Sequence, residues 1–284
     1  MIQKALKIIN TIHMKIIHIE QGTKEWHDQR RCRITGTKLK AVMGTTEARR
    51  SIIAELIAEE ATEQSKEFKS TATMERGNAE EIFAVKAFEA RTGKKVDRVG
   101  MCEHDEYEWI ALSPDGLIKD AEGKYSEAVE VKCPDSKNAI LYKIENMVPM
   151  YETGLLTKYT KAEMLEILEK TDTPHNPKGT ISELEGLLPP GYNGKPSSQA
   201  PFLGIPTEYK WQVVNYFLVN NDLKKLHFLI YDARFINDDQ KTYTVVVERS
   251  NEILQEAIAQ AMEALLIFRE DWMRWKEIVL PTEF

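Results

Sequence analysis

Residues 112–134 read LSPDGLIKDAEGKYSEAVEVKCP, and they decide the fold because they predict a β-hairpin that carries charged side chains. The SPDG run at 113–116 is a strong turn signal, since Pro114 fixes φ and Gly116 tolerates positive φ. Residues 128–133 then alternate apolar and polar positions, which is typical of a strand, and Pro134 ends it. The turn taken alone, or a Glu-x-Lys pair on an edge strand, is a common structural feature and indicates no chemistry.

Three charged side chains of this hairpin converge. Glu130 and Lys132 are two positions apart on the predicted strand, so they point to the same face at roughly 7 Å, beside Asp115 at the mouth of the hairpin. Carboxylate oxygens suit Mg²⁺ or Mn²⁺, and a neighbouring lysine can position or deprotonate an attacking water. The combination predicts hydrolysis of a phosphodiester.

Composition is that of a globular protein. The chain has 284 residues, 42% of them hydrophobic, and strand patterns that alternate with helical ones, which predicts one α/β domain with an insertion. No run approaches 18 apolar residues and no signal peptide is recognisable, so a cytoplasmic location is expected. The three cysteines lack a CxxC pair, which argues against a zinc site or a disulfide framework.

Charge is unevenly distributed. The net charge of −7 has the wrong sign for a protein that binds nucleic acid over its whole surface. Between positions 24 and 50, however, basic residues outnumber acidic ones by eight to three. A solvated helical face explains this excess as well as a phosphate-binding surface does.

Further along the chain, several segments have clear periodicity. Helices are expected from about Lys24, after a break at 34–36, across 51–93 with a looser link at 65–73, from 208 to about 220, and from 251 to about 278. Residues 225–234 (KLHFLIYDAR) and 241–250 (KTYTVVVERS) read as two strands that complete the sheet.

The pattern PD-x(14)-E-x-K, formed by Asp115, Glu130 and Lys132, resembles the PD-(D/E)xK nuclease superfamily in order and spacing. From Ile17 to about Ser250, with one interruption, the chain is similar to the phage lambda exonuclease family of viral recombination nucleases. The resemblance implies a restriction-endonuclease-like α/β core, with a mixed central sheet flanked by helices and a small helical insertion. It also implies a DNA recombination enzyme of a phage or prophage in a bacterial host.

The segment GTKEWHDQRRCRITGTKLKAVMG is similar to the N-terminal motif of that family through Trp26, Arg30 and Thr37. The resemblance implies that Arg30 and Thr37 bind the terminal 5′-phosphate of DNA, a role that suits a forked guanidinium and a hydroxyl. The family has serine at the Thr37 position. Without the resemblance, Arg30 would be a surface residue and Trp26 a core residue.

In MERGNAEEIFAVKAFEARTG, Gly77 and Glu81 match the Gly-x(3)-Glu of the family, which implies that Glu81 is a third carboxylate near the metal. Glu80 beside it is the competitor. Met74 stands where the family has an apolar wedge that separates terminal base pairs, although a core role explains it equally well. Ala72 replaces a basic residue of the family, which weakens the expectation of strand-guiding contacts here.

The insertion at 156–199 contains two helical patterns, a TDTPHNPKG turn and a PPGYNGKPSSQAP linker. Its sequence pattern is similar to that of SAP/HeH-type modules, and this resemblance implies binding of DNA or of a protein. Five lysines against six acidic residues leave it nearly neutral, so we expect protein docking or a structural flap. We therefore divide the chain into a leader at 1–15, a nuclease core at 16–155 and 200–284, and the insertion between the two parts of the core. Met14 is an alternative start of the protein.

The resemblance assigns roles to the remaining site residues. Asp115 and Glu130, with the carbonyl of Val131 and help from Glu81, would hold Mg²⁺ or Mn²⁺, two ions per site. Lys132 and Gln212 would orient the water. We therefore predict a metal-dependent 5′-to-3′ exonuclease on linear double-stranded DNA that leaves 3′ single-stranded overhangs.

Other interpretations stay open. A structure-specific or restriction-type endonuclease of the same superfamily would use the same residues, and a non-catalytic DNA-end binder would have lost some of them. A hydrolase built on Cys133 and a remote histidine lacks the strand–turn–helix context of a nucleophile. The family implies a homo-oligomer, a trimeric ring around DNA, and a single-strand annealing protein as partner.

Overall fold

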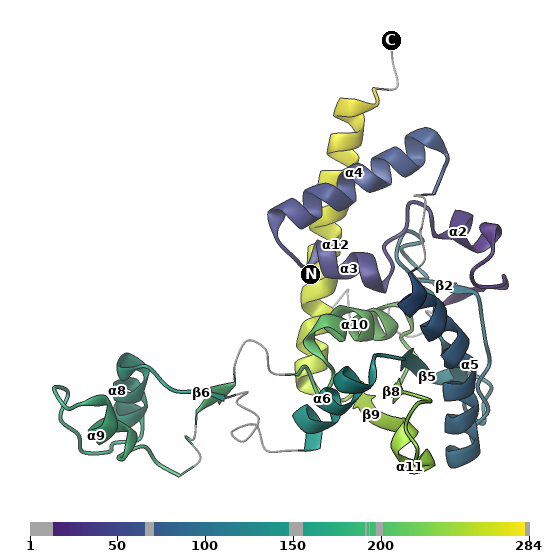
Figure 1. Cartoon of the computed structure of the whole chain (residues 1–284). Coiled ribbons are helices and arrows are strands. Elements are labelled where there is room, and N and C mark those ends of the chain that lie inside the picture. The colour runs from purple at the N-terminus through teal and green to yellow at the C-terminus, as the bar shows by residue number, and fades with distance from the viewer. Residues whose placement is uncertain are drawn as a thin grey trace. The chain divides into compact units, whose positions relative to one another are not determined.

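The computed structural model describes residues 14–65, 71–147, 156–190, 192, 194–196 and 201–281. The chain forms two compact units (Figure 1), the first comprising Met1–Ala139 and Glu208–Phe284 and the second Ile140–Thr207. Most of the predicted leader, the link at 66–70 and most of the linker after Pro190 lie outside the described residues. The predicted domain boundaries stay a prediction.

A four-stranded mixed sheet forms the centre of the first unit. Its order is β4 (Gly116–Lys119), β5 (Tyr125–Lys132), β8 (Lys225–Tyr231) and β9 (Thr242–Glu248). β5 and β8 run parallel, whereas the two outer pairs are antiparallel. The predicted hairpin and both later strands are confirmed, as is the α/β class with a mixed sheet flanked by helices.

A second sheet, of order β1-β2-β3, was not predicted. β1 (Lys15–Ile17), β2 (Met101–Glu103) and β3 (Ala111–Leu112) are antiparallel and very short. The chain leaves β3 and enters β4 through Ser113–Asp115, so the SPDG run joins the two sheets, and the turn of the hairpin lies at 120–124. Gly116 is required at this junction because a Cβ there would stand 2.2 Å from Val96 Cγ1.

Helices enclose the sheets. α5 (Ala72–Thr92) packs Ala84, Val85 and Phe88 against β4, β5 and β8. α10 (Lys210–Val219) is buried along seven consecutive residues and contacts α3 (Gly36–Val42), β3 and α12 (Glu252–Val279). α12, yellow in Figure 1, also contacts α4 (Thr46–Thr62). Within the described part of the chain, none of the helices is both long enough and apolar enough to cross a membrane.

Side-chain caps fix where these helices begin. Thr23 accepts a hydrogen bond from Trp26 N at the start of α2 (Lys24–Arg30), and Asn251 accepts from Ile253 N and Leu254 N at the start of α12. Such caps replace the hydrogen bonds that the first turn of a helix lacks. The predicted starts near Lys24 and at Asn251 are confirmed.

The second unit is built from short elements. α8 (Lys161–Lys170) and α9 (Ile181–Glu185) each begin with a capping box, and Met164, Leu168 and Leu184 form their buried core. β6 (Leu156–Thr157) and β7 (Lys195–Pro196) pair antiparallel, so the two ends of the helical module are adjacent. α6 (Ser136–Met147) crosses the boundary between the units and was not predicted.

An ion pair between a buried carboxylate and a half-exposed guanidinium holds the chain after β8. Asp232 is fully buried and accepts hydrogen bonds from Arg234 Nε at 2.8 Å and Nη2 at 3.0 Å. Arg234 also donates to the carbonyl of Pro134, just after β5. Burial alone would raise the pKa of Asp232, but hydrogen bonds from Arg234 and Ser136 outweigh it and lower the pKa to about 2.

This shift predicts a pH-dependent contribution to stability. Because the pKa is lowered on folding from its usual 3.8, the contribution is present above that value and is lost as the pH falls towards 2. Asp232→Asn should therefore lower the free energy of unfolding by about 2 kcal/mol at pH 7, with a difference that shrinks below about pH 4. Urea unfolding at several pH values measures this. Asp238→Asn, which removes an exposed carboxylate nearby, should change little, and an equal loss for both variants would contradict the assignment.

Candidate active site

Asp115, Glu130 and Lys132 lie together at the open end of the hairpin. The Asp115 carboxylate accepts a hydrogen bond from Val131 N at 2.7 Å. This bond links the residue just before β4 to the end of β5. Lys132 Nζ lies 2.5 Å from Glu130 Oε1, and the Glu130 residue is only 6% exposed. The period-two placement of Glu130 and Lys132 on one face is thus confirmed.

Burial is the largest influence on the electrostatics of this group, and neighbouring negative charges come second for both Asp115 and Lys132. Burial raises the pKa of Asp115 well above its usual range, and the charges of Glu130 and Glu81 raise it further. Burial would lower the pKa of Lys132, but Glu130 and Asp115 outweigh it and raise that pKa. The lysine is therefore an ammonium, and it does not neutralise both neighbouring carboxylates.

Sequence reasoning missed Tyr216, which is 1% exposed on α10. Its hydroxyl lies 2.6 Å from Glu130 Oε2 and 3.2 Å from the Val129 carbonyl, and it accepts a hydrogen bond from Asp115 N at 3.1 Å. Tyr216 comes four positions after Gln212, in an apolar run whose only signal is that of a core helix. Nothing in the sequence pairs it with residues about ninety positions away.

Glu81 and Glu80 point to different partners. Glu81 pairs with Arg98 Nη2 at 2.6 Å, and burial, together with the nearby charge of Glu130, raises its pKa even though Arg98 opposes this. Glu80 pairs with Arg76 at 2.8 Å, and Arg76 also donates to the Cys133 carbonyl. Of the two, Glu81 therefore faces the carboxylates of the hairpin.

Gln212 lies against the first turn of α3. A Cβ at Gly36 would meet the Gln212 Cα at 3.2 Å, so glycine permits this close approach. The side-chain oxygen of Gln212 is buried and has no hydrogen-bond partner among the described residues. Lys132 Nζ lies 5.0 Å from the centre of the Tyr209 ring, one turn before Gln212. The predicted contact between Gln212 and Lys132 stays a prediction.

Arg30 is surrounded by hydroxyl groups. Its guanidinium donates to Ser113 Oγ at 2.6 Å and to Thr35 Oγ1 at 3.4 Å, and it stacks 4.2 Å from the centre of the Trp26 ring. Thr35 Oγ1 in turn lies 3.4 Å from Thr37 Oγ1. Burial lowers the pKa of Arg30 to about 10, and the nearby charge of Glu59 opposes this only in part.

Several other cations of the basic stretch bind partners within the protein. Lys38 pairs with Glu59 at 3.1 Å, Arg33 bonds to Glu103, and Arg49 Nε donates to the Val42 carbonyl at 2.7 Å. Pairs of this kind satisfy the charges internally. Arg30 differs from them, since hydroxyls are its hydrogen-bond partners.

One cavity of about 960 Å³ connects these groups. The predicted site residues that line it are Arg30, Thr37, Met74, Glu81, Asp115, Val131 and Lys132. Met74 is 43% exposed on the first turn of α5, so it is not a core residue. Gly77 also lines the cavity, and a Cβ there would touch nothing within 4 Å. The helix therefore leaves space beside Glu81.

The donor set was tested against a divalent metal ion. No group of three or more His, Cys, Asp or Glu side chains in the described ranges is arranged to hold a metal. Two carboxylates, Asp115 and Glu130, adjoin the Val131 peptide, and Mg²⁺ commonly uses one or two carboxylates with waters and substrate oxygens. As oxygen donors beside one peptide group, at the wall of an open cavity lined by Asp115 and Val131, these residues fit such an ion.

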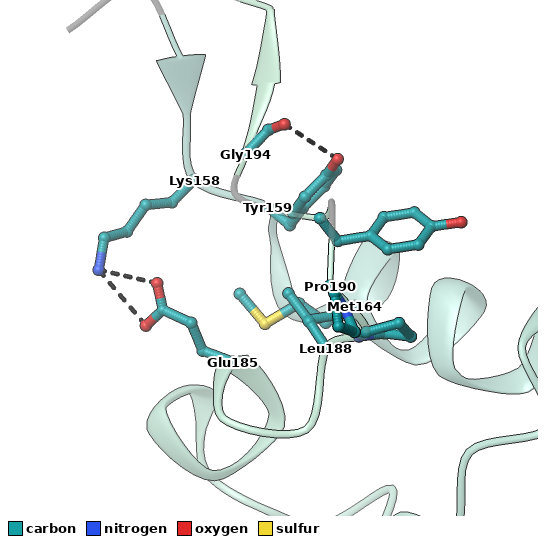
Figure 2. A pocket seen from close by; sticks show the side chains of 9 residues that line it. Lys158, Tyr159, Met164, Glu185, Leu188, Pro190 and Gly194 are labelled. Carbon is teal, nitrogen blue, oxygen red and sulfur yellow. Dashed lines mark hydrogen bonds and ion pairs between the residues drawn. The ribbon is translucent and has the colours of Figure 1, made fainter. Parts of the chain in front are cut away.

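The second unit has a cavity of its own (Figure 2). Its volume is about 510 Å³, and Tyr159, Met164, Leu188 and Pro190 contribute apolar walls. The Lys158–Glu185 ion pair at 3.0 Å closes one side, and Tyr159 donates a hydrogen bond to the Gly194 carbonyl at 3.1 Å on the other. This cavity is amphipathic and carries no cluster of cations.

Comparison with known proteins finds one family model and several solved structures that resemble this chain. Residues 25–152 match the family model described as a YqaJ-like viral recombinase domain. An alkaline exonuclease from Laribacter hongkongensis is similar in structure, with a TM-score of 0.59 and 21% identity over 90% of this chain and 96% of that one. Its complex with dAMP gives a TM-score of 0.57, also at 21% identity, over 90% and 98% of the two chains.

A phage-related exonuclease from Haemophilus somnus is more distant, with a TM-score of 0.46 and 13% identity over 85% of this chain and 95% of that one. No curated protein sequence matches the chain. The predicted resemblance to viral recombination proteins is confirmed, and the Laribacter structures confirm the fold.

Proposed function

We propose that this protein is a metal-dependent exonuclease that degrades one strand of linear double-stranded DNA from the 5′ end and leaves 3′ single-stranded overhangs. The observation that carries the proposal is one cavity lined both by residues of a carboxylate–lysine group and by a guanidinium whose hydrogen bonds, within the described part of the chain, go to hydroxyls. The first group suits phosphodiester hydrolysis and the second suits a terminal phosphate. The exonuclease fold, which in the Laribacter relative was solved with dAMP, supports it.

The chemistry would divide between the residues as follows. Asp115 and Glu130, with the carbonyl of Val131, would hold Mg²⁺ or Mn²⁺, which activates water and stabilises the developing charge on the phosphate. Lys132, which pairs with Glu130 at 2.5 Å, would orient the attacking water. Glu81, on α5, would help to hold the metal. Gln212, on α10, would help to orient the water.

Polarity follows from the position of Arg30 in this proposal. Its guanidinium, with Thr37 and the adjacent hydroxyls of Thr35 and Ser113, offers several donors to a phosphate group in a half-buried place. A 5′-terminal phosphate held there would place the next phosphodiester towards Asp115 in the same cavity. Met74, exposed on the wall, would separate the terminal base pairs.

An endonuclease of the same superfamily remains the second candidate, because the carboxylate–lysine group does not itself require a DNA end. Digestion of linear and circular duplexes of one sequence, in Mg²⁺ and in EDTA, separates the two. Loss of the linear substrate alone supports the exonuclease. Cleavage of the circle would support the endonuclease, and no cleavage of either would leave a non-catalytic DNA-end binder.

The carboxylate and the lysine should be needed for cleavage and not for binding. Asp115→Asn and Lys132→Ala should each abolish measurable cleavage and leave the affinity for DNA within about tenfold, because these groups act on the transition state. Gel-based digestion and anisotropy titration measure the two effects. Glu122→Gln removes an exposed carboxylate from the tip of the same hairpin and should be fully active. Cleavage by Asp115→Asn at the parental rate would contradict the site.

Arg30 should determine the preference for phosphorylated ends. Arg30→Ala should reduce the ratio of rates on 5′-phosphate and 5′-hydroxyl duplexes to near one, since a charge-assisted contact of this kind contributes roughly 1.5–3 kcal/mol. Arg50→Ala serves as the control, because this exposed residue belongs to the same basic stretch and pairs with Glu47. An unchanged preference in Arg30→Ala would make Arg30 a structural residue.

The second unit is proposed to dock a protein partner, of which a single-strand annealing protein is the candidate. Its helices have their own buried core, and β6 pairs with β7, so the two ends of the module are adjacent. Replacement of residues 156–199 by a short Gly/Ser link should therefore leave a folded nuclease with nearly unchanged kcat on naked DNA and abolish co-purification of the partner. Loss of salt-sensitive DNA affinity with an intact partner complex would instead make the module a DNA-binding arm.

Assembly is part of the same proposal. We propose a homo-oligomer, specifically a ring of three copies around the duplex, which would explain how a chain of net charge −7 stays on DNA. Sedimentation of the purified protein measures the number of copies.

A further inference from the structure

We infer that Arg98 binds a phosphate of the DNA, the one that follows the scissile phosphodiester on its 3′ side, so that a cation holds the strand on each side of the hydrolytic group. This inference rests on the proposed function, which sets where the 5′ end and the scissile bond lie. None of the sequence patterns assigned a role to Arg98. It is a substrate-binding residue in this proposal, and neither a metal ligand nor a catalytic residue.

The backbone around Arg98 is fixed on both sides. Asp97 and Leu117, the second residue of β4, exchange two N–H···O hydrogen bonds of 2.8 and 2.9 Å. The Val99 carbonyl accepts a hydrogen bond of 2.9 Å from a side-chain amide of the cavity wall. The Arg98 backbone is therefore anchored beside the start of β4, on the wall of the cavity that Asp115 also lines.

The side chain of Arg98 is only partly engaged by the protein. Its Nη2 donates to Glu81 Oε1 at 2.6 Å, and 49% of the side chain is exposed. A guanidinium has five N–H donors in a planar fork. Within the described part of the chain, Glu81 is the hydrogen-bond partner of Arg98, and the bond uses one nitrogen. The other nitrogens keep donors that phosphate oxygens can accept.

A neighbouring pair on α5 shows how an arginine with a purely structural role is bound. Arg76 Nη1 donates to Glu80 Oε2 at 2.8 Å, and its Nη2 donates to the Cys133 carbonyl at 2.9 Å. Only 25% of the Arg76 side chain is exposed, and the residue is not among those that line the cavity. Contacts within the protein thus occupy both terminal nitrogens of Arg76 and only one of Arg98.

The position of Arg98 selects the phosphate. Arg30 donates to Ser113 Oγ, two positions before Asp115. Arg98 follows the residue that pairs with Leu117, two positions after Asp115. The two arginines therefore flank Asp115 within one cavity. With the terminal phosphate at Arg30 and the next phosphodiester at Asp115, the phosphate that follows in the same strand comes to Arg98.

A cation is needed at this place because the adjoining groups are acidic. The charges of Glu130 and Glu81 raise the pKa of Asp115, so the three carboxylates are close together, and each repels a phosphate group. Lys132 is already paired with Glu130. Arg98 can bind Glu81 with one nitrogen and a phosphate with the others, which offsets the repulsion where the strand passes Glu81.

The test is a double-mutant cycle between protein and substrate, measured as DNA binding by anisotropy in EDTA so that no strand is cut. The 5′-phosphorylated duplex carries a neutral methylphosphonate at one of its first four internucleotide linkages, of which the first is the scissile one. Arg98→Ala should bind the unmodified duplex at least about tenfold more weakly. A methylphosphonate at the second linkage should weaken the parent similarly and Arg98→Ala no further, because that contact is already lost.

A charge-matched variant separates the phosphate contact from the neutralisation of Glu81. Arg98→Ala combined with Glu81→Gln removes both charges of the pair and leaves the net charge unchanged, and it should lose the same affinity as Arg98→Ala. The slope of log Kd against log[KCl] should fall by roughly 0.7–0.9 in Arg98→Ala, as expected for one phosphate contact. It should keep the parental value in Arg98→Lys and in Arg91→Ala, which removes an exposed cation from the last turn of α5.

Two results would overturn the inference. The first is a methylphosphonate effect at the second linkage that is equal in the parent and in Arg98→Ala. The second is parental affinity in the charge-matched variant, which would limit Arg98 to neutralising Glu81. If the parent binds the duplex but does not cut it in Mg²⁺, the proposed function fails, and the cycle still decides whether Arg98 binds that phosphate. If the parent binds no DNA, both proposals fail.

Discussion

Burial of two neighbouring carboxylates is the constraint on which the active site depends. Asp115 and Glu130 are held close together out of bulk water, and the charge of Glu130 helps to raise the pKa of Asp115 well above its usual range. Left alone, such a pair would take up a proton or move apart. The protein holds it with the Lys132 ammonium, the Val131 N–H and the Tyr216 hydroxyl. These groups lower the repulsion without removing it.

α10 supplies the rigidity that this arrangement needs. Asn215 Nδ2 donates to the Ala111 carbonyl at 2.9 Å, Tyr216 binds Asp115 and Glu130, and Asn220 Nδ2, just past the helix, donates to the Tyr125 carbonyl at 2.8 Å. Three polar side chains of one buried segment thus contact β3, the residue just before β4, and β5 near its two ends. Buried hydrogen bonds of this kind require one register, because a shifted helix would leave them unpaired.

The sequence predicted those parts of the fold whose signals are local. The strand at Glu130 alternates, the helix at Lys24 has its cap, and the long helix after Asn251 has a full amphipathic period. The strands β1 to β3 were missed because two or three residues are too short for a period to emerge. Tyr216 was missed for a different reason. Its partners are distant in the chain, and an apolar helix predicts only burial.

The two ends of the cavity carry opposite charges that the protein compensates only in part, through Lys132 at the Asp115 end and through the charge of Glu59 at the Arg30 end. At one end, the pKa of Asp115 is raised by burial and by its acidic neighbours; at the other, burial lowers the pKa of Arg30 to about 10, and hydroxyls of Ser113 and Thr35 are its hydrogen-bond partners. Either charge would be stabilised by a ligand of opposite sign. A terminal phosphate satisfies Arg30 and repels Asp115, whereas a cation does the reverse. If the proposed function holds, nucleic acid and a divalent cation together would satisfy both ends, so binding of each should strengthen binding of the other.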